Sequence, residues 1–198
     1  MNTICTGVFT MNLPNKLSIL RLILIPVIVA VFYIPQIPYN YLISAVIFSI
    51  AALTDYLDGY IARKYNLVTD LGKFIDPIAD KVLVLSVLII ILTEPFILGV
   101  YGATFGKIVG GVGVTIIVAR EMIISVMRMI AAGKGKVLAA EKIGKIKTFA
   151  TDFAIVFLLV SANFTNFYHV GVVLFIISVA LTLYSGIVYL IKNREVFK

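Results

Sequence analysis

The chain has 198 residues, 61% of them hydrophobic, a mean hydropathy of +1.08 and a formal net charge of +7 at pH 7. An ordinary soluble domain is about 45–50% apolar, so this composition excludes one and predicts an all-α integral membrane protein. Cys5 is the only cysteine and His169 the only histidine, which excludes an intrachain disulfide and argues against a zinc site.

Six apolar runs follow one another along the chain, each close to the roughly 20 residues that span a bilayer as a helix. We therefore expect six transmembrane helices in a single membrane domain over residues 1–198. Residues 1–10 are predicted to be an N-terminal extension, because the segment from Met11 reads like a natural start. The expected spans are 17–35, 40–62, 74–93, 100–130, 149–163 and 168–191.

The cations lie beside the spans, and nearly all fall on one side when six helices are threaded through a membrane. Their largest cluster runs from Lys134 to Lys147, whereas Lys107 is the only cation near the opposite side. By the positive-inside rule, we expect the basic side and both termini to face the cytoplasm. Topology thus explains the positive charge, and we expect no nucleic-acid partner.

The first span is predicted to begin just after Pro14, with Asn15 capping the N-terminus of the helix. Arg21 lies about one turn inside this span. Two interpretations of Arg21 stay open. Either its side chain reaches back to the membrane interface, or it contacts a lipid phosphate near the acidic residues of the next two spans.

Four aspartates stand at the adjoining ends of the second and third spans. On insertion scales an Asp at a helix centre costs about 2.5–3.5 kcal/mol, so four of them need something that neutralises them. Spacings of three and four residues place each pair on one helix face, and two facing helices would gather all four carboxylates. Such oxygens suit hard divalent cations such as Mg²⁺ or Mn²⁺. The four are Asp55, Asp58, Asp76 and Asp80.

The acids belong to a longer pattern that also fixes glycine, alanine and arginine positions. It reads Asp55-x2-Asp58-Gly59-x2-Ala62-Arg63-x8-Gly72-x3-Asp76-x3-Asp80. A glycine inside a helix costs about 1 kcal/mol relative to alanine unless close backbone access is needed, and an arginine supplies a fixed cation for a phosphate. The pattern resembles the complete signature of the CDP-alcohol phosphotransferase family, with every position and gap matched.

The resemblance implies a homodimeric, six-helix enzyme that moves a substituted phosphate from a CDP-linked lipid to a small alcohol and releases CMP. Its polar cavity would face the cytoplasm. The resemblance also implies two divalent cations, Mg²⁺ or Mn²⁺, bound by the four aspartates, with Asp80 acting in addition as the general base. The expected contacts to the CDP-linked lipid come from Gly59, Arg63, Thr69, Asn15 and Ser18.

Two arginines, Arg120 and Arg128, lie within the long fourth apolar run, and lysines follow it. Topology and attraction to anionic lipid, at about 1 kcal/mol per cation, account for most of the lysines but not for arginines inside a span. We interpret the arginines as ligands of a second, phosphorylated substrate, together with Lys136 and Lys145. Asp152 is interpreted as a buried acid paired with a lysine of the preceding loop.

Two further segments indicate which members of the family the chain resembles most. NLPNKLSILRLILIP near the start, and AREMIISVMRMIAAGKGKV with GKIKT later, resemble bacterial members that use sn-glycerol 3-phosphate as the acceptor. This resemblance implies transfer of the phosphatidyl group of CDP-diacylglycerol to glycerol 3-phosphate, giving phosphatidylglycerophosphate and CMP. It places the reaction in phospholipid biosynthesis, at the cytoplasmic membrane of a bacterial cell.

Two alternatives remain. Within the family, the acceptor could be serine, inositol phosphate or another alcohol. Outside it, a divalent-cation transporter also carries acids inside its spans, but it predicts acids spread through the depth of the bilayer. Here they cluster toward one end of two adjacent spans. An enzyme therefore fits the pattern better than a transporter.

Overall fold

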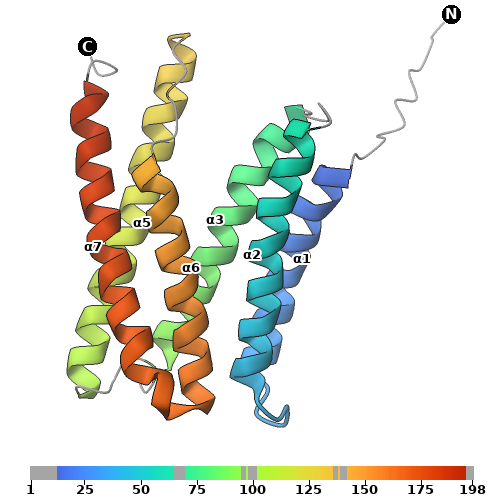
Figure 1. Cartoon of the computed structure of the whole chain (residues 1–198), viewed down its shortest axis with the longest axis vertical. Coiled ribbons are helices and arrows are strands. Elements are labelled where there is room, and N and C mark those ends of the chain that lie inside the picture. Colours follow the sequence, from blue (N-terminus) through green and yellow to red (C-terminus); the bar gives the residue numbers. More distant parts are fainter. Residues whose placement is uncertain are drawn as a thin grey trace, which may run out of the picture.

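The computed structural model describes residues 13–64, 70–94, 97, 102–135, 138 and 142–194. Within these ranges the chain forms six α-helices, one short 3₁₀-helix and no strand (Figure 1). Labelled as in Figure 1, they are α1 (Leu13–Tyr33), α2 (Asn40–Lys64), α3 (Asp70–Thr93), α5 (Ala103–Gly133), α6 (Lys142–Asn163), η1 (Thr165–Phe167) and α7 (Tyr168–Lys192).

Each predicted span corresponds to one of these helices, which confirms the all-α fold, but several ends differ. α6 begins at Lys142 rather than at residue 149, and α3 begins at Asp70 rather than at residue 74. Hydropathy detects only the apolar part of a helix, whereas lysine is a good helix former and an acid at a helix start complements the dipole. The polar ends of the helices therefore extend beyond the apolar runs.

The start of α1 differs from the prediction as well. The helix begins at Leu13, so Asn15 lies within its first turn and does not cap it. Pro14 is tolerated there because the amide that it lacks would have no partner inside the helix.

The helices alternate in direction and form two groups. One end of the molecule, at the top of Figure 1 and called the upper end below, holds the starts of α1, α3 and α6 and the ends of α2, α5 and α7. α1 packs against α2 and α3, whereas α7 packs against α5 and α6. The groups meet where α2 contacts α6 and where α3 contacts α5 and α6.

The main apolar core fills the lower half of the bundle. Its residues come from the late part of α1, the early part of α2, the late part of α3, the middle of α5, the late part of α6 and the early part of α7. Among the described residues, the buried charged side chains, Arg21 and Lys147, lie instead near the starts of α1 and α6, toward the upper end. The largest fully buried core residues are Ile28, Phe32, Phe48, Leu83, Leu88, Ile91, Ile97, Ile117, Ile155 and Phe175.

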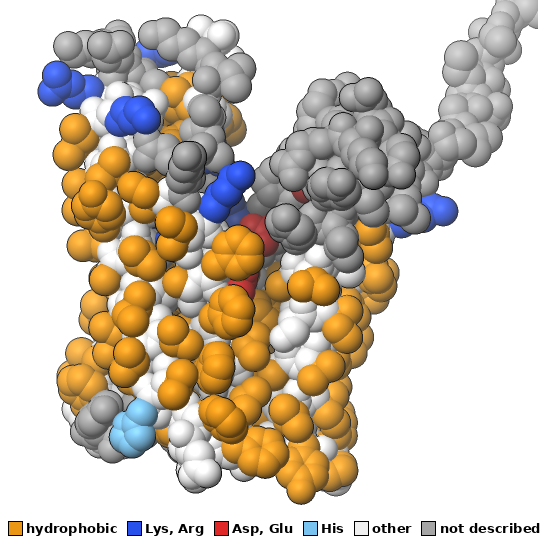
Figure 2. Space-filling view, viewed as in Figure 1, with side chains coloured by type: hydrophobic (Ala, Val, Ile, Leu, Met, Phe, Trp, Pro, Cys, Tyr) orange, Lys and Arg blue, Asp and Glu red, His pale blue; other side chains and the backbone are white. Residues whose placement is uncertain are grey.

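The outer surface is apolar. Large hydrophobic side chains such as Met122, Met129 and Ile191 are more than half exposed, and Figure 2 shows such side chains over much of one face. Soluble monomers rarely expose continuous patches of this kind. In the described part of the chain, three helices are long and apolar enough to cross a membrane: Asn15–Tyr33, Thr104–Gly133 and Thr165–Lys192. The fold and surface are those of an all-α integral membrane protein.

Candidate functional site

Polar side chains of α1 connect the acidic residues of α2 and α3. Arg21 is fully buried and forms an ion pair with Asp55. Its Nη2 also donates to Ser18 Oγ over 3.5 Å, and Ser18 Oγ donates to Asp76 Oδ1. Ser18 and Arg21 are three residues apart and therefore lie on the same face of α1. One helix thus holds a carboxylate from each of its two neighbours.

This geometry argues against one of the two interpretations of Arg21, while its predicted contact with a lipid phosphate stays a prediction. Arg21 does not reach back to the membrane interface, because its side chain is buried against Asp55. A buried cation needs a partner of opposite charge, and Asp55 supplies it. Asn15 is also buried, with only 4% of its surface exposed, and it lies on the same helix as Ser18 and Arg21. The predicted contacts of Asn15 and Ser18 with a lipid substrate stay predictions.

Several predicted residues lie outside the described part. Asp58, Gly59 and Arg63 belong to α2, but their side chains are not described, and Thr69 and Lys136 fall in undescribed segments. Among the side chains that the structure does describe, no group of three Asp, Glu, His or Cys residues could hold a metal ion. The four-carboxylate centre therefore stays a prediction.

The chemistry of the described acids nevertheless fits a divalent cation. Asp55 and Asp76 both contact α1, 38% of the Asp55 side chain is exposed, and the charges of Asp55 and Arg21 act on Asp80. The three acids therefore share one polar region at the upper end. Carboxylate oxygens are the ligands that Mg²⁺ and Mn²⁺ prefer.

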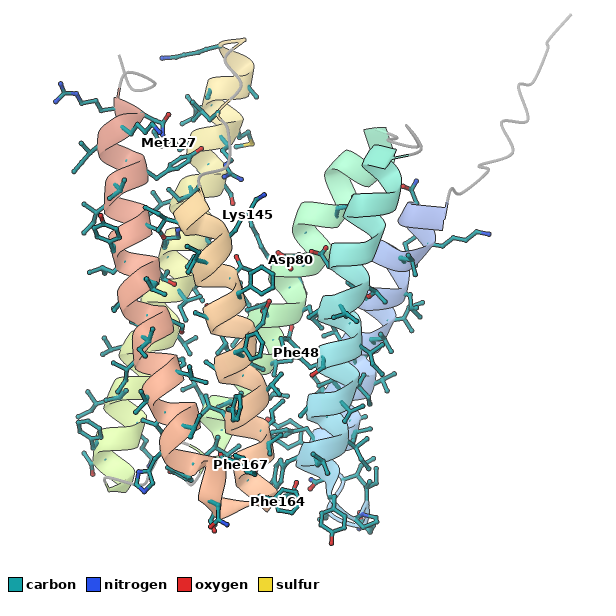
Figure 3. All side chains as sticks on the ribbon, in the orientation of Figure 1. Phe48, Asp80, Met127, Lys145, Phe164 and Phe167 are labelled. Carbon is teal, nitrogen blue, oxygen red and sulfur yellow. The ribbon has the colours of Figure 1, made fainter. Side chains whose placement is uncertain are left out.

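A cavity of about 260 Å³ lies beside this region, between α3, α5, α6 and α7. Its wall carries Asp80 together with Arg120, Arg128 and Lys145, four of the predicted site residues. Figure 2 shows acidic and basic side chains meeting in a hollow between the two helix groups. In Figure 3, Asp80 of α3 and Lys145 of α6 extend toward the same space. The structure thus brings one acid of the signature next to predicted phosphate ligands.

Arg120 is held between α5 and α7. Its Nη1 donates to Glu121 Oε1 over 2.9 Å, and its Nη2 donates to Ser185 Oγ over 3.3 Å. Gly186 leaves room for it, because a Cβ at that position would lie 3.0 Å from Arg120 Cγ. A larger residue at position 186 would crowd the Arg120 side chain, so the glycine favours the close approach of Arg120 to α7.

Arg128 is held by the same neighbouring helix. Its Nε donates to Tyr189 Oη over 3.2 Å, and its guanidinium carbon lies 5.5 Å from the centre of the Tyr189 ring. This geometry combines a hydrogen bond with a cation–π interaction. Tyr189 is 2% exposed and lines the cavity, although it is not among the predicted site residues.

The predicted site residues do not include Lys81, Glu121 or Lys147, and all three line the cavity. Lys147 is buried and forms an ion pair with Glu121 Oε1, the same atom that accepts from Arg120. Lys81 donates to Ser125 Oγ. A helical pattern could have revealed the α6 side of the cavity, because Gly144, Lys147, Thr148 and Thr151 recur at spacings of three and four residues.

The predicted pairing of Asp152 with a lysine is not found among the described residues. Lys147 pairs with Glu121 instead, and Asp152 Oδ1 is buried with no hydrogen-bond partner in the described part of the chain. Asp152 lines the same cavity as Asp80.

The fold and the site define a helical membrane protein with a cation-rich cavity beside an acidic signature. A profile of the family described as CDP-alcohol phosphatidyltransferase matches residues 11–184. The chain belongs to this family.

Several bacterial relatives share the name CDP-diacylglycerol–glycerol-3-phosphate 3-phosphatidyltransferase. The relative in Bacillus subtilis is 36% identical over 94% of this chain and 97% of its own length. The relatives in Salmonella choleraesuis and Shigella flexneri are 40% and 39% identical, each over 92% of this chain and 95% of their own length. The similarity therefore extends over nearly the whole chain.

Proposed function

We propose that the protein transfers the phosphatidyl group of CDP-diacylglycerol to sn-glycerol 3-phosphate, giving phosphatidylglycerophosphate and CMP. The observation that carries the proposal is the cavity in which Asp80 lies beside Arg120, Arg128 and Lys145. It combines an acid of the family signature with cations for a phosphate. The reaction named for the bacterial relatives is the one that needs this combination.

The acceptor would enter this cavity with its phosphate toward the cations. Arginine offers a planar, bidentate donor set that suits a phosphate dianion, and both arginines are oriented by residues of α7. Glu121 joins Arg120 and Lys147, which keeps two cations from different helices close together. The cations would thus bind the acceptor phosphate and orient the rest of the molecule toward Asp80.

Asp80 would take the proton of the attacking hydroxyl. The hydroxyl oxygen then bonds to the phosphorus that carries diacylglycerol, the bond from this phosphorus to the bridging oxygen breaks, and CMP leaves. Gly59, Arg63 and Thr69, together with Asn15 and Ser18 of α1, are proposed to contact the CDP-diacylglycerol donor. This arrangement would leave the two acyl chains in the lipid.

Asp55, Asp58, Asp76 and Asp80 are proposed to hold two divalent cations. Bound there, the cations would neutralise the diphosphate and stabilise charge on the leaving oxygen. The ion pair of Arg21 with Asp55 and the hydrogen bond of Ser18 with Asp76 would orient two of these carboxylates.

The topology and assembly belong to the same proposal. The lysines near the starts of α1 and α6 and near the end of α5 support a cytoplasmic position for the upper end, in the membrane of a bacterial cell. We propose that the whole chain, 1–198, is one membrane domain and that it acts as a homodimer.

The test is CMP release by the purified protein in detergent with CDP-diacylglycerol and Mg²⁺, with and without glycerol 3-phosphate. We expect release that requires the acceptor and falls by at least about a hundredfold in Asp80→Asn, in the range seen when a positioned acid or base is removed. Glu94→Gln is the matched control, since Glu94 follows the lower end of α3, and it should retain activity.

The same assay distinguishes the alternatives. A preference for serine or inositol phosphate over glycerol 3-phosphate would change the acceptor but keep the reaction class. Absence of CMP release with every alcohol, together with Mg²⁺ or Mn²⁺ flux in proteoliposomes, would replace the proposal by ion transport.

A further inference from the structure

Asp152 is the acid in the cavity that the proposed reaction leaves without a role. It lies on α6, lines the cavity together with Asp80, and its Oδ1 is buried without a hydrogen-bond partner in the described part of the chain. Leaving a buried acceptor unsatisfied costs about 1–3 kcal/mol, so such an atom needs an explanation. The other acids of the cavity have one: Asp80 belongs to the signature, and Glu121 pairs with Arg120 and Lys147.

A carboxylate in the lining of a cavity is unfavourable for a ligand that offers only negative charge. A phosphate held by Arg120 and Lys147 would be repelled by Asp152, and this repulsion is strengthened where water is excluded. The same carboxylate is a strong acceptor for a hydroxyl, because hydrogen bonds to charged groups are stronger than hydrogen bonds between neutral groups. The combination of cations and an unsatisfied acid therefore selects a ligand that carries both a phosphate and a donating hydroxyl.

The arrangement along α6 separates these two functions. Lys147, Thr151 and Asp152 all line the cavity, and at a rise of 1.5 Å per residue Asp152 lies about 7.5 Å along the helix axis from Lys147. The cationic part of the wall is thus nearer the upper end, and the hydroxyl and carboxylate part lies deeper in the bundle. An elongated ligand can place its phosphate at the first part and a hydroxyl at the second.

We infer that Asp152 is a specificity-determining residue that accepts a hydrogen bond from the secondary hydroxyl of the acceptor. This inference rests on the proposed function, in which the primary hydroxyl of glycerol 3-phosphate is the nucleophile and reacts beside Asp80. The secondary hydroxyl on the adjacent carbon then satisfies Asp152 Oδ1. Asp152 thereby favours polyol phosphates over simple hydroxyalkyl phosphates.

The test compares two acceptors that differ only in this hydroxyl, sn-glycerol 3-phosphate and 3-hydroxypropyl phosphate, in wild type, Asp152→Asn and Asp152→Ala. Wild type should prefer glycerol 3-phosphate by about 10- to 100-fold in kcat/KM, the range for a hydrogen bond to a charged group. Asp152→Ala should abolish the preference by losing activity with glycerol 3-phosphate alone. Asp152→Asn keeps an acceptor oxygen and should retain part of the preference.

Thermal stabilisation of each variant by either acceptor, in the absence of the lipid donor, gives a second readout that does not depend on turnover. Wild type should be stabilised more by glycerol 3-phosphate, and Asp152→Ala equally by both. An unchanged acceptor preference in both variants, or no preference in wild type, overturns the inference while the proposed function stands. Absence of turnover with glycerol 3-phosphate in wild type would instead show that the proposed function has failed.

Discussion

At the scale of single residues, Arg21 shows how a charge can lie inside an apolar helix without reaching water. Its guanidinium contacts Asp55 with one nitrogen and Ser18 with another, and Ser18 in turn contacts Asp76. The planar fork of arginine reaches two separate acceptors with two nitrogens, whereas lysine would have to reach both from a single nitrogen. We therefore propose that Arg21 is a positioning residue for the acids of α2 and α3.

Replacing Arg21 by lysine should separate positioning from acceptor binding. Losing one charge-assisted hydrogen bond costs about 1.5–3 kcal/mol, so Arg21→Lys should lower kcat by about tenfold or more. The KM for glycerol 3-phosphate should change little, because Arg21 is not among the residues that line the cavity. Steady-state CMP release measures both constants.

Lys16→Met is the control for this change, because Lys16 is an exposed cation on the same helix. It should leave both constants near their wild-type values. A rise in KM without a fall in kcat for Arg21→Lys would contradict the positioning role.

At the scale of helices, the pair α6 and α7 depends on close backbone approach. A Cβ on Gly171 would lie 3.1 Å from the backbone nitrogen of Leu158 and 3.1 Å from the carbonyl carbon of Phe157. Backbone atoms within a helix cannot move aside as a flexible side chain can. The glycine therefore sets the distance between α6 and α7, the two helices that carry Lys147 and Tyr189 to the cavity.

Gly171→Ala should therefore destabilise the protein although alanine is the better helix former. Overpacking typically costs about 1–3 kcal/mol, more than the roughly 1 kcal/mol that alanine gains in a helix interior. Thermal unfolding in detergent should show a lower midpoint for this variant. Gly111→Ala is the matched control: Gly111 lies in α5 with no atom within 4 Å of an added Cβ, so its midpoint should stay the same or rise.

At the scale of the whole molecule, charge and apolar surface are arranged along one axis. The main apolar core lies in the lower half, whereas the acids and the cation-rich cavity lie in the upper half. Burying charges at mid-bilayer is costly, so a site of this kind is favoured near an interface where water and soluble substrates can enter. Transfer of a group between lipid and water requires that the lipid donor, the soluble acceptor and the released CMP all reach the same end of the molecule.

The orientation can be tested by labelling single cysteines in a Cys5→Ser background. Asn166→Cys, in η1 at the lower end, should react with a membrane-impermeant maleimide in intact cells. Lys134→Cys, just after α5 at the upper end, should react only after the membrane is opened. The reverse pattern would contradict a cytoplasmic position for the cavity.

Local pattern was enough to predict the helices and much of the candidate site. Lipid imposes apolar runs of fixed length, which identified six helices, and the cost of acids and arginines inside such runs drew attention to Asp80, Arg120 and Arg128. The polar helix ends were missed because hydropathy falls where a helix leaves the apolar region. α6 thus begins earlier than its apolar run.

Long-range packing decided which side chains the charged residues contact. Nothing in the spacing of residues indicates that Arg21 pairs with Asp55, that Glu121 joins Arg120 to Lys147, or that Asp152 Oδ1 is buried without a partner in the described part. These relations depend on which helix faces lie against each other, a property of the assembled bundle. The sequence alone thus determined the kind of chemistry, because charged residues inside a membrane are costly and are rare there without a function. The tertiary structure determined which charges neutralise one another and which line the cavity.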